Sequence, residues 1–232
     1  MNLGVNCDGE MLSILLYTDD IVLLAESEQA LQEMINKATD WCHNWRLKIN
    51  VSKTNVVHFR KPTVGMTEFV FKFGNSEITK EDEYKYLDVI MHSSLNVDVA
   101  TNLLSGSASR ALGAVINKHK AIGGLGFSAF EALYDNLVVP ILDYGSGVWG
   151  TGSYPKPQTI QNRAARSFLG VHRFASNVAI QGDIGWDSCR VRQKLNVIRL
   201  WCRLIAMNPS RLTKRIFLWD YYIDKHHILH NM

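Results

Sequence analysis

The sequence predicts an α+β fold in two parts, with antiparallel hairpins and one long packing helix over residues 1–96 and an α-helical region over residues 97–232. Short apolar runs rich in β-branched residues recur in the first part, with turn residues between them, and such runs are typical of strands. Apolar residues at helical spacing dominate the second part. The character of the chain changes near residue 96, where we place the boundary.

The first hairpin is predicted over residues 13–25, within the stretch SILLYTDDIVLLAES. Two apolar runs flank a polar centre, so Asp19 and Asp20 are expected at the tip of a tight turn. Adjacent carboxylates repel each other, and a hard cation such as Mg²⁺ would neutralise them. Because Asp is also a common turn residue, a turn without function is the alternative.

A long amphipathic helix is predicted next, in SEQALQEMINKATDWCHNW. Ser27 is a suitable N-cap, and apolar residues recur at helical spacing along one face. Trp41 and Trp45 belong to that series, so we expect both indole rings in the core beneath the helix.

Three further strand segments complete the first part of the chain. RLKINVSKTNVVHF predicts strand, turn and strand, with residues 50–53 in the turn. FVFKFG over 69–74, an Asn-Ser turn and EIT over 77–79 predict a second hairpin, and YKYLDVIM over 84–91 predicts one short strand.

The second part is predicted to be helical. A helix is expected from about residue 97 to residue 119, and the glycine-rich AIGGLGF after it is expected to be a loop, because it lacks the Lys-Ser/Thr of a phosphate-binding loop. Another helix should end near Pro140, before an irregular apolar segment. Two basic helices follow, in QTIQNRAARSFLG and SCRVRQKLNVIRLWCRLIA. The inward residues predicted for the first helix are Leu103, Leu104, Ala108, Ala111, Leu112, Val115 and Ile116.

Composition restricts the class of protein. The 232 residues are 47% hydrophobic, which is enough for one large domain or two small ones. No apolar run approaches the roughly 18 residues of a membrane span, and the N-terminus lacks the regions of a signal peptide. Four scattered cysteines without a CxxC pair favour an intracellular protein with free thiols and argue against a zinc knuckle. No Lys/Arg run is long enough for a nuclear signal, so nuclear and cytoplasmic locations both stay open.

The net charge of +3 conceals two halves of opposite sign. Residues 1–100 carry −6 and residues 101–232 carry +9, which suggests metal chemistry beside a polyanion-binding surface. Solvated helix faces are the alternative. His226, His227 and His230 have metal-ligand spacing, although a frayed terminal segment explains them better. The basic residues expected to contact nucleic-acid phosphates are Arg163, Arg166, Arg190, Arg192, Lys194, Arg199 and Arg203.

Several segments together resemble one family. SILLYTDDIVLLAES resembles the catalytic Y-A-D-D motif of the reverse transcriptases of non-LTR (LINE-type) retrotransposons. LQEMINKATDWCHNWRLKINVSKTNVVHF is similar to the helix and Asn-x-x-Lys-Thr turn that follow that motif, and YKYLDVI resembles the primer-contacting Y-L-G strand. LYDNLVVPILDYGSGVWG and RAARSFLGV are similar to the thumb and the downstream segment. The resemblance covers nearly the whole chain and implies a partial polymerase palm over 1–96 with a thumb-like helical region over 97–232.

The resemblance also implies roles for individual residues. Asp19 and Asp20 would hold Mg²⁺ for nucleotidyl transfer, with RNA template, DNA primer and dNTP as partners. Lys53 would donate a proton to the pyrophosphate. As a lone turn residue, Lys53 would instead be a solvated surface lysine. Contacts to primer or substrate are implied for Tyr17, Thr18, Tyr86 and Leu87. For Tyr17 the alternative is packing of its ring on the helix, and for Tyr86 and Leu87 the alternative is a buried edge strand.

Three departures from the family pattern limit the expected activity. Thr18 replaces Ala in Y-A-D-D, and Asp88 replaces the Gly of Y-L-G, which adds a charge where the family contacts primer. Only 16 residues precede Tyr17, so the fingers and the earlier palm strand with another metal-binding Asp are not expected. Asp8 and Glu10 lead directly into the hairpin and are not expected to close the site. We therefore expect an unpaired strand edge at the hairpin and no polymerase activity of the chain alone.

Two functions follow from these observations. The first is a fragment of an RNA-directed DNA polymerase from a mobile element, with Mg²⁺ as cofactor. The alternative is a non-catalytic nucleic-acid-binding remnant of such an element. Intact Asp19, Asp20 and Lys53 favour the first function, whereas Asp88 and the missing upstream palm favour the second.

Overall fold

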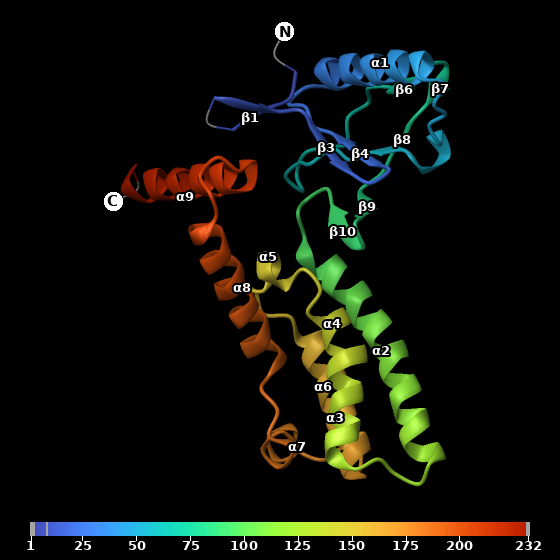
Figure 1. Cartoon of the computed structure of the whole chain (residues 1–232), viewed down its shortest axis with the longest axis vertical. Helices are drawn as coiled ribbons and strands as arrows, with labels where there is room; N and C mark the ends of the chain where they lie inside the picture. The colour runs from blue at the N-terminus through green and yellow to red at the C-terminus, as the bar shows by residue number, and fades with distance from the viewer. Residues whose placement is uncertain (1–2, 8, 231–232) are drawn as a thin grey trace. The chain divides into compact units, whose positions relative to one another are not determined.

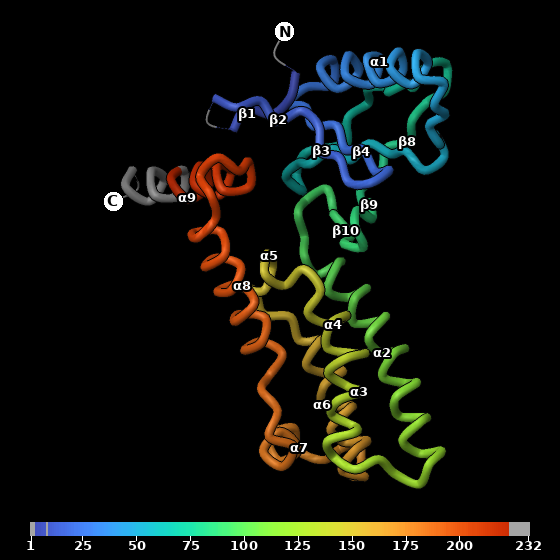
Figure 2. The backbone as a smooth tube through the Cα atoms, viewed as in Figure 1, coloured from blue at the N-terminus to red at the C-terminus, as the bar shows by residue number. Residues whose placement is uncertain are grey.

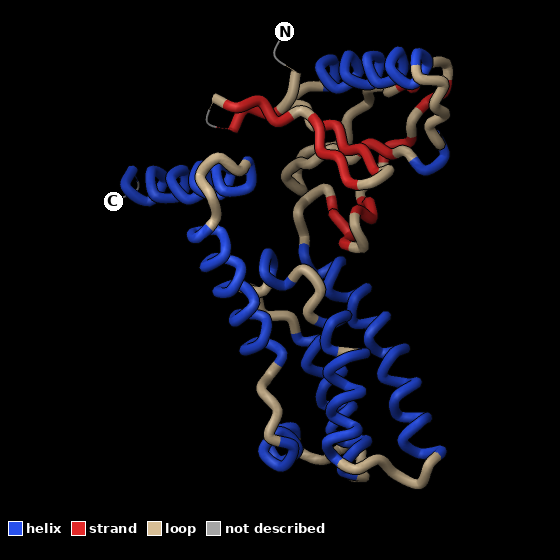
Figure 3. Tube along the Cα trace, in the orientation of Figure 1, coloured by secondary structure: helices blue, strands red, loops and turns tan. Residues whose placement is uncertain are grey.

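The computed structural model describes residues 3–7 and 9–230, with side chains described as far as residue 222. It confirms the α+β class, because strands form small hairpins in the first part of the chain and helices dominate thereafter (Figure 3). The chain divides into two compact units. Unit 1 comprises Met1–Tyr84 with Ala206–Met232, and unit 2 comprises Lys85–Ile205. The functional boundary predicted at residue 96 stays a prediction.

Two antiparallel hairpins begin unit 1 (Figure 2). The first joins β1 (Val5–Cys7) to β2 (Glu10–Leu12), and the second joins β3 (Ile14–Tyr17) to β4 (Asp20–Leu23). Each hairpin is a two-stranded sheet on its own among the described residues, so β3 and β4 both carry an unpaired edge. The open edge expected from the sequence is confirmed.

Helix α1 (Glu28–Asn44) has the predicted N-cap, because the Ala30 amide donates to Ser27 Oγ over 3.2 Å. Its buried side chains include Met34 and Ile35, and the latter joins the small core of unit 1. The core placement of Trp41 and Trp45 is wrong, since they are 49% and 68% exposed. The helix has more apolar residues than this small core can cover, and Trp45 lies beyond its last turn.

The remainder of the strand-rich segment is built from very short pieces. The turn predicted at 50–53 is confirmed as a 3₁₀ turn, but no strand precedes it, because residues 47–50 have no regular structure. The second hairpin is confirmed with its turn at residues 74–75, one position before the predicted Asn-Ser pair. The elements are η1 (Val51–Lys53), β5 (Asn55–Val56), β6 (Lys72–Phe73), β7 (Ser76–Glu77) and β8 (Thr79–Lys80), with β5 and β8 parallel.

The single strand predicted over 84–91 is instead a hairpin of β9 (Glu83–Tyr86) and β10 (Val89–His92). Leu87 and Asp88 form its two-residue turn, with φ of 47° and 63°. Two positive φ values belong to a type I′ turn, which prefers Asn and Gly and tolerates Asp. The apolar Leu at the first turn position hides this turn from sequence patterns.

Unit 2 is a helical bundle in which α3 and α6 run alongside α2 (Figure 1). Its core includes Ala108 and Leu112 of α2, Phe130 and Tyr134 of α3, and Ala164 of α6. The helices are α2 (Val97–Ala121), α3 (Phe127–Leu137), α4 (Val139–Leu142), α5 (Ser146–Trp149), α6 (Pro155–Leu169), α7 (Asn177–Ile184) and α8 (Cys189–Ala206).

The long helix from residue 97, the glycine-rich loop and the two basic helices are confirmed. Leu103 is wrong as an inward residue, because it is half exposed and small residues such as Ala100 and Ser105 occupy the buried side of α2. Helix α7 was not predicted from the sequence. Nor was α9 (Leu212–His230), which replaces the frayed segment expected there. The side chains of His226, His227 and His230 lie outside the described residues.

Two structural observations concern the cysteines and the possible membrane spans. Cys7, Cys42, Cys189 and Cys202 are all free. No helix in the described part of the chain combines the length and hydropathy needed to cross a membrane.

Candidate functional site

The carboxylate pair lies at the tip of the β3–β4 hairpin. Tyr17 pairs with Asp20 across the hairpin, so Thr18 and Asp19 form a two-residue turn. Thr18 has a φ of 53°, a left-handed conformation at the first turn position that lets the chain reverse within two residues. Asp19, Asp20 and the Tyr17 ring are all exposed, which leaves the carboxylate oxygens open to solvent and ligands.

Two carboxylates are the acidic groups that this hairpin offers to a cation. Over residues 3–7 and 9–222, no group of three or more His, Cys, Asp or Glu side chains is arranged to hold a metal ion. Glu10 is engaged elsewhere in unit 1, through an ion pair of 2.7 Å with Arg215. Asp8 lies outside the described residues. The donor set therefore suits a hard cation in type but supplies few ligands.

One face of the same hairpin is apolar and uncovered. Opposite residues of an antiparallel pair share a face, so Ile14 and Leu16 lie beside Leu23 and Ile21 respectively. Leu23 packs against the core of unit 1, whereas Ile14, Leu16 and Ile21 are 45%, 68% and 45% exposed. The hairpin is thus anchored at the end of β4 and open toward its tip.

Lys53 lies in a separate element of unit 1, at the end of the η1 turn. Its side chain is exposed, and its backbone carbonyl accepts a hydrogen bond of 3.3 Å from the Tyr84 hydroxyl. Asn50 Oδ1 accepts from Ser52 Oγ, and the Asn50 carbonyl accepts from the Thr54 hydroxyl. The conformation of the turn therefore depends on Asn50 and Thr54, while the Lys53 ammonium group stays available to a ligand.

The primer-contact candidates Tyr86 and Leu87 lie in the β9–β10 hairpin, where both are half-buried. The Leu87 carbonyl accepts a hydrogen bond of 2.9 Å from the Tyr144 hydroxyl, which fixes the turn to the helical part of unit 2. Asp88 forms an ion pair with Lys85 at 2.6 Å, but both side chains are largely exposed, so this pair contributes little to stability.

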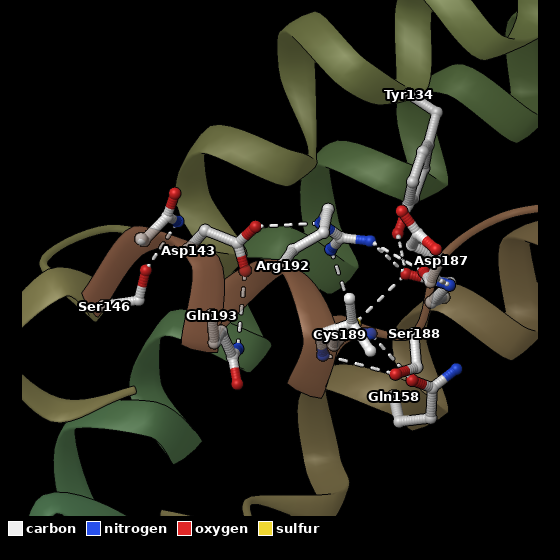
Figure 4. A network of polar contacts seen from close by, with 12 residues as sticks. Tyr134, Asp143, Ser146, Gln158, Asp187, Ser188, Cys189, Arg192 and Gln193 are labelled. Carbon is white, nitrogen blue, oxygen red and sulfur yellow. Dashed lines mark hydrogen bonds and ion pairs between the residues drawn. The ribbon is translucent and has the colours of Figure 1, made fainter. Parts of the chain in front are cut away.

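Arg192 is held inside unit 2 rather than presented to solvent (Figure 4). Its Nε donates to Asp143 Oδ2 over 2.9 Å, and its Nη1 donates to Gln161 Oε1. That buried Gln161 oxygen also accepts from Cys189 Sγ and the Tyr134 hydroxyl. The network therefore ties α3, α6 and α8 to the residue after α4.

Burial and charge shift the pKa values in this network. Burial opposes the charge on Arg192, but Cys189 and Asp143 outweigh it and hold the pKa of the guanidinium above its ordinary value. Burial raises the pKa of the Cys189 thiol to about 11, against the opposing effect of Arg192. Burial likewise raises the pKa of Tyr134. The buried thiol is therefore protonated and unreactive at neutral pH.

The other predicted cations divide into engaged and exposed groups. Arg166 Nη2 donates to the Ala175 carbonyl over 2.9 Å and to Asn177 Oδ1, which holds the loop before α7. The nucleic-acid contacts predicted for Arg166 and Arg192 stay untested, while their observed partners are internal. The remaining predicted cations are exposed on α6 and α8: Arg163, Arg190, Lys194, Arg199 and Arg203.

Sequence reasoning missed Asp143, Gln161 and Tyr144. Asp143 follows a segment predicted to be irregular, and no charge pattern marks it as the partner of Arg192, 49 residues later. Gln161 lies in a helix whose polar residues read as solvated, although its side chain is 1% exposed.

Comparison with known proteins shows which family the first part of the chain resembles. Residues 4–91 match the family model described as reverse transcriptase (RNA-dependent DNA polymerase), a range that includes Tyr17–Asp20, Lys53 and Tyr86–Leu87. The chain is 26% identical over 224 residues to a probable RNA-directed DNA polymerase from transposon BS of Drosophila melanogaster, which covers 86% of this chain and 24% of that protein. These similarities support a LINE-type (non-LTR) reverse transcriptase as the source of the matching segment.

Two further relatives are also proteins of mobile elements. The Pol polyprotein of the type-1 element R1 of Bradysia coprophila is 26% identical over 196 residues, with 78% of this chain and 20% of that protein covered. The RNA-directed DNA polymerase of the mobile element jockey of Drosophila melanogaster is 23% identical over 223 residues, with 90% and 24% covered. The chain thus spans about a quarter or less of the length of these relatives. No solved structure matches it.

Similarity to this family supports the expectations of a divalent metal and a nucleic-acid partner. Reverse transcriptases use a divalent metal and bind a nucleic-acid template and primer. The comparisons thus support a reverse transcriptase domain fragment of non-LTR retrotransposon polymerases, which is the first of the two predicted functions.

Proposed function

We propose that this chain supplies the metal-binding hairpin and part of the nucleic-acid-binding surface of an RNA-directed DNA polymerase. The observation that carries the proposal is the exposed Asp19–Asp20 pair at a two-residue turn, inside the segment that matches the reverse transcriptase family. The exposed cations of α6 and α8 support the second role, because Lys and Arg bind backbone phosphates without reading sequence.

Asp19 and Asp20 would hold Mg²⁺ through their carboxylate oxygens, which are the ligands that this hard cation prefers. Bound there, the metal would lower the cost of the negative charge that develops during phosphoryl transfer. A site of one or two carboxylates leaves most ligand positions to water, so we expect weak binding by the isolated chain.

The other predicted residues would position the primer and the nucleotide. Tyr17 shares a face with Asp20, so its exposed ring would support the primer end beside the carboxylates. The left-handed conformation of Thr18 would hold both carboxylates at the tip. The exposed Lys53 ammonium group would donate a proton to the leaving pyrophosphate. Tyr86 and Leu87 would contact the primer strand.

Paramagnetic Mn²⁺ tests the metal site directly. We expect the amide NMR signals of residues 17–21 to broaden on titration of the full chain with Mn²⁺, and the broadening to disappear in the Asp19→Asn/Asp20→Asn double variant. Asp40→Asn is the matched control, because Asp40 is an exposed carboxylate on α1 outside the hairpin. Equal broadening in the double variant and the wild type would contradict the proposal.

A further inference from the structure

A cleft on unit 2 carries a more specific inference. Residues of α5 and of the segment before it form one wall, and α8 forms the other wall, around a volume of about 490 Å³. We call it the α5–α8 cleft. Its lining residues include Ser146 and Val148 on one side and Asn196, Arg199, Leu200 and Arg203 on the other.

Glycines allow the two walls to approach closely. A Cβ on Gly147 would lie 3.2 Å from Leu200 Cβ and 3.3 Å from the Asn196 carbonyl oxygen. A Cβ on Gly150 would lie 2.7 Å from the Gln193 carbonyl oxygen. The backbone of α5 therefore rests directly on α8, and the cleft opens along the line where the helices meet.

The polar groups of the cleft are ordered by hydrogen bonds. Asn196 Nδ2 donates to the buried Ser146 Oγ over 2.9 Å, and Arg199 Nη1 donates to Asn196 Oδ1 over 3.1 Å. This chain of contacts runs from α5 to the Arg199 guanidinium and orients it at the cleft. Because Asn196 is a neutral acceptor, the positive charge of Arg199 is not compensated by this contact.

The charges favour an anion in this cleft. Arg199 and Arg203 lie one helical turn apart, and neither has a carboxylate within 4.0 Å among the described residues. The acidic lining residue, Asp143, is already neutralised by Arg192 at 2.9 Å. Two uncompensated guanidinium groups therefore border the same space.

A neighbouring cleft lacks the excess positive charge of the α5–α8 cleft. It also has a volume of about 490 Å³ and shares Asp143, Asn196 and Arg199, but its other lining residues include Arg192 and Asp187. Its lining contains two carboxylates and two guanidinium groups, so its net formal charge is zero, although Arg199 forms no ion pair with either carboxylate among the described residues. The excess positive charge belongs to the α5–α8 cleft alone of the two.

We propose that the α5–α8 cleft binds one phosphate group of a nucleic-acid strand, with Arg199 and Arg203 as its ligands. Planar guanidinium groups bind phosphate oxygens bidentately, and two of them on successive turns of α8 converge on one anion. The apolar Leu200 and the 80% exposed Val148 border the same cleft, where they can contact the adjoining sugar. This inference rests on the proposed function, in which unit 2 binds nucleic acid, and it names the α5–α8 cleft as the place where one phosphate binds.

The test measures binding of a fluorescein-labelled single-stranded RNA 12-mer to the full chain by fluorescence anisotropy at several salt concentrations. We expect Arg203→Gln to weaken binding about tenfold at low salt, and to reduce the slope of log affinity against log salt by about one. Arg199→Gln should do the same. Arg110→Gln is the control, because Arg110 is an exposed arginine of unit 2 that lies on α2, outside the cleft and outside the predicted nucleic-acid-binding residues, and it should change affinity less than twofold.

A second measurement separates this inference from the broader function. Inorganic phosphate, followed by ³¹P line broadening, should bind the wild type and the Arg110→Gln chain but not the Arg203→Gln chain. Phosphate binding of this kind without RNA binding would support the anion subsite and count against nucleic acid as its source. Equal RNA affinity of the Arg110→Gln and Arg203→Gln chains would overturn the subsite while leaving a diffuse basic surface. Absence of both RNA and phosphate binding would also overturn it.

Discussion

Loss of the Asp143 carboxylate should destabilise unit 2 strongly. The side chain of Asp143 is 9% exposed and that of Arg192 is 21% exposed, and the two form an ion pair of 2.9 Å. Asp143→Ala would leave a buried guanidinium without its counter-charge, and breaking such a pair costs about 3–5 kcal/mol. Arg192 would keep neutral acceptors on Gln161 and Asp187, so we expect the lower end of that range, about 3 kcal/mol.

A double-mutant cycle isolates the pair. Asp143→Ala, Arg192→Met and the double variant should be compared by urea denaturation, with hydrogen exchange of residues 127–205 to assign the loss to unit 2. We expect the double variant to be less destabilised than the sum of the single variants by about 2 kcal/mol or more. Arg190→Met, an exposed control on the same helix, should stay within about 0.5 kcal/mol of the wild type. Additive single effects, or an Asp143→Ala cost no larger than the control, would refute the reasoning.

Four further predictions follow from particular residues. Asp88→Gly should raise the free energy of unfolding by about 0.5 kcal/mol in thermal melts, because Asp88 has a φ of 63°; destabilisation would contradict this. In native protein at pH 8, maleimide should label exposed Cys202 first and buried Cys189 slowest, by peptide mass spectrometry; equal rates would count against the burial. Burial raises the pKa of Cys189 from 9.0 to about 11 on folding, so the stability contributed by the protonated thiol is complete below pH 9 and is lost between about pH 9 and 11. In urea titrations, the free energy of unfolding of Cys189→Ala should therefore fall less over that pH range than that of the wild type. The chain alone should not extend a primer on RNA with Mg²⁺ or Mn²⁺, and extension abolished by Asp19→Ala would show this to be wrong.

Local sequence signals predicted the elements whose stability is local. Ser27 caps α1 as expected, because a hydroxyl that accepts from the third following amide needs no tertiary partner. The hairpin turn lies between the two apolar runs as expected, although it comprises Thr18 and Asp19 and leaves Asp20 as the first residue of β4. The carboxylate part of the candidate site was therefore visible in the sequence.

Tertiary contacts decided the elements that the sequence did not predict. YKYLDVIM has no Gly or Asn to mark a turn, yet the chain reverses at Leu87, whose carbonyl accepts from Tyr144, 57 residues away. Periodicity alone placed Trp41 in the core of unit 1, but how many positions of a helix are covered depends on what packs against it. A short stretch of sequence around Leu87 or Trp41 shows neither the hydrogen bond from Tyr144 nor the size of the core of unit 1, so neither feature could be predicted from it.

The basic residues of unit 2 show why net charge identifies a ligand class but not its binding site. A count of +9 over residues 101–232 treats every arginine as equally available to a polyanion. Arg192 is not available to a polyanion, because it forms an ion pair with Asp143. Arg166 donates hydrogen bonds to the Ala175 carbonyl and to the side-chain amide of Asn177. Arg199 and Arg203 keep their charge at a cleft, so the field of the whole unit can attract a nucleic acid while two residues hold one of its phosphates. Removing an engaged arginine should therefore affect stability first, whereas removing Arg203 should affect affinity alone.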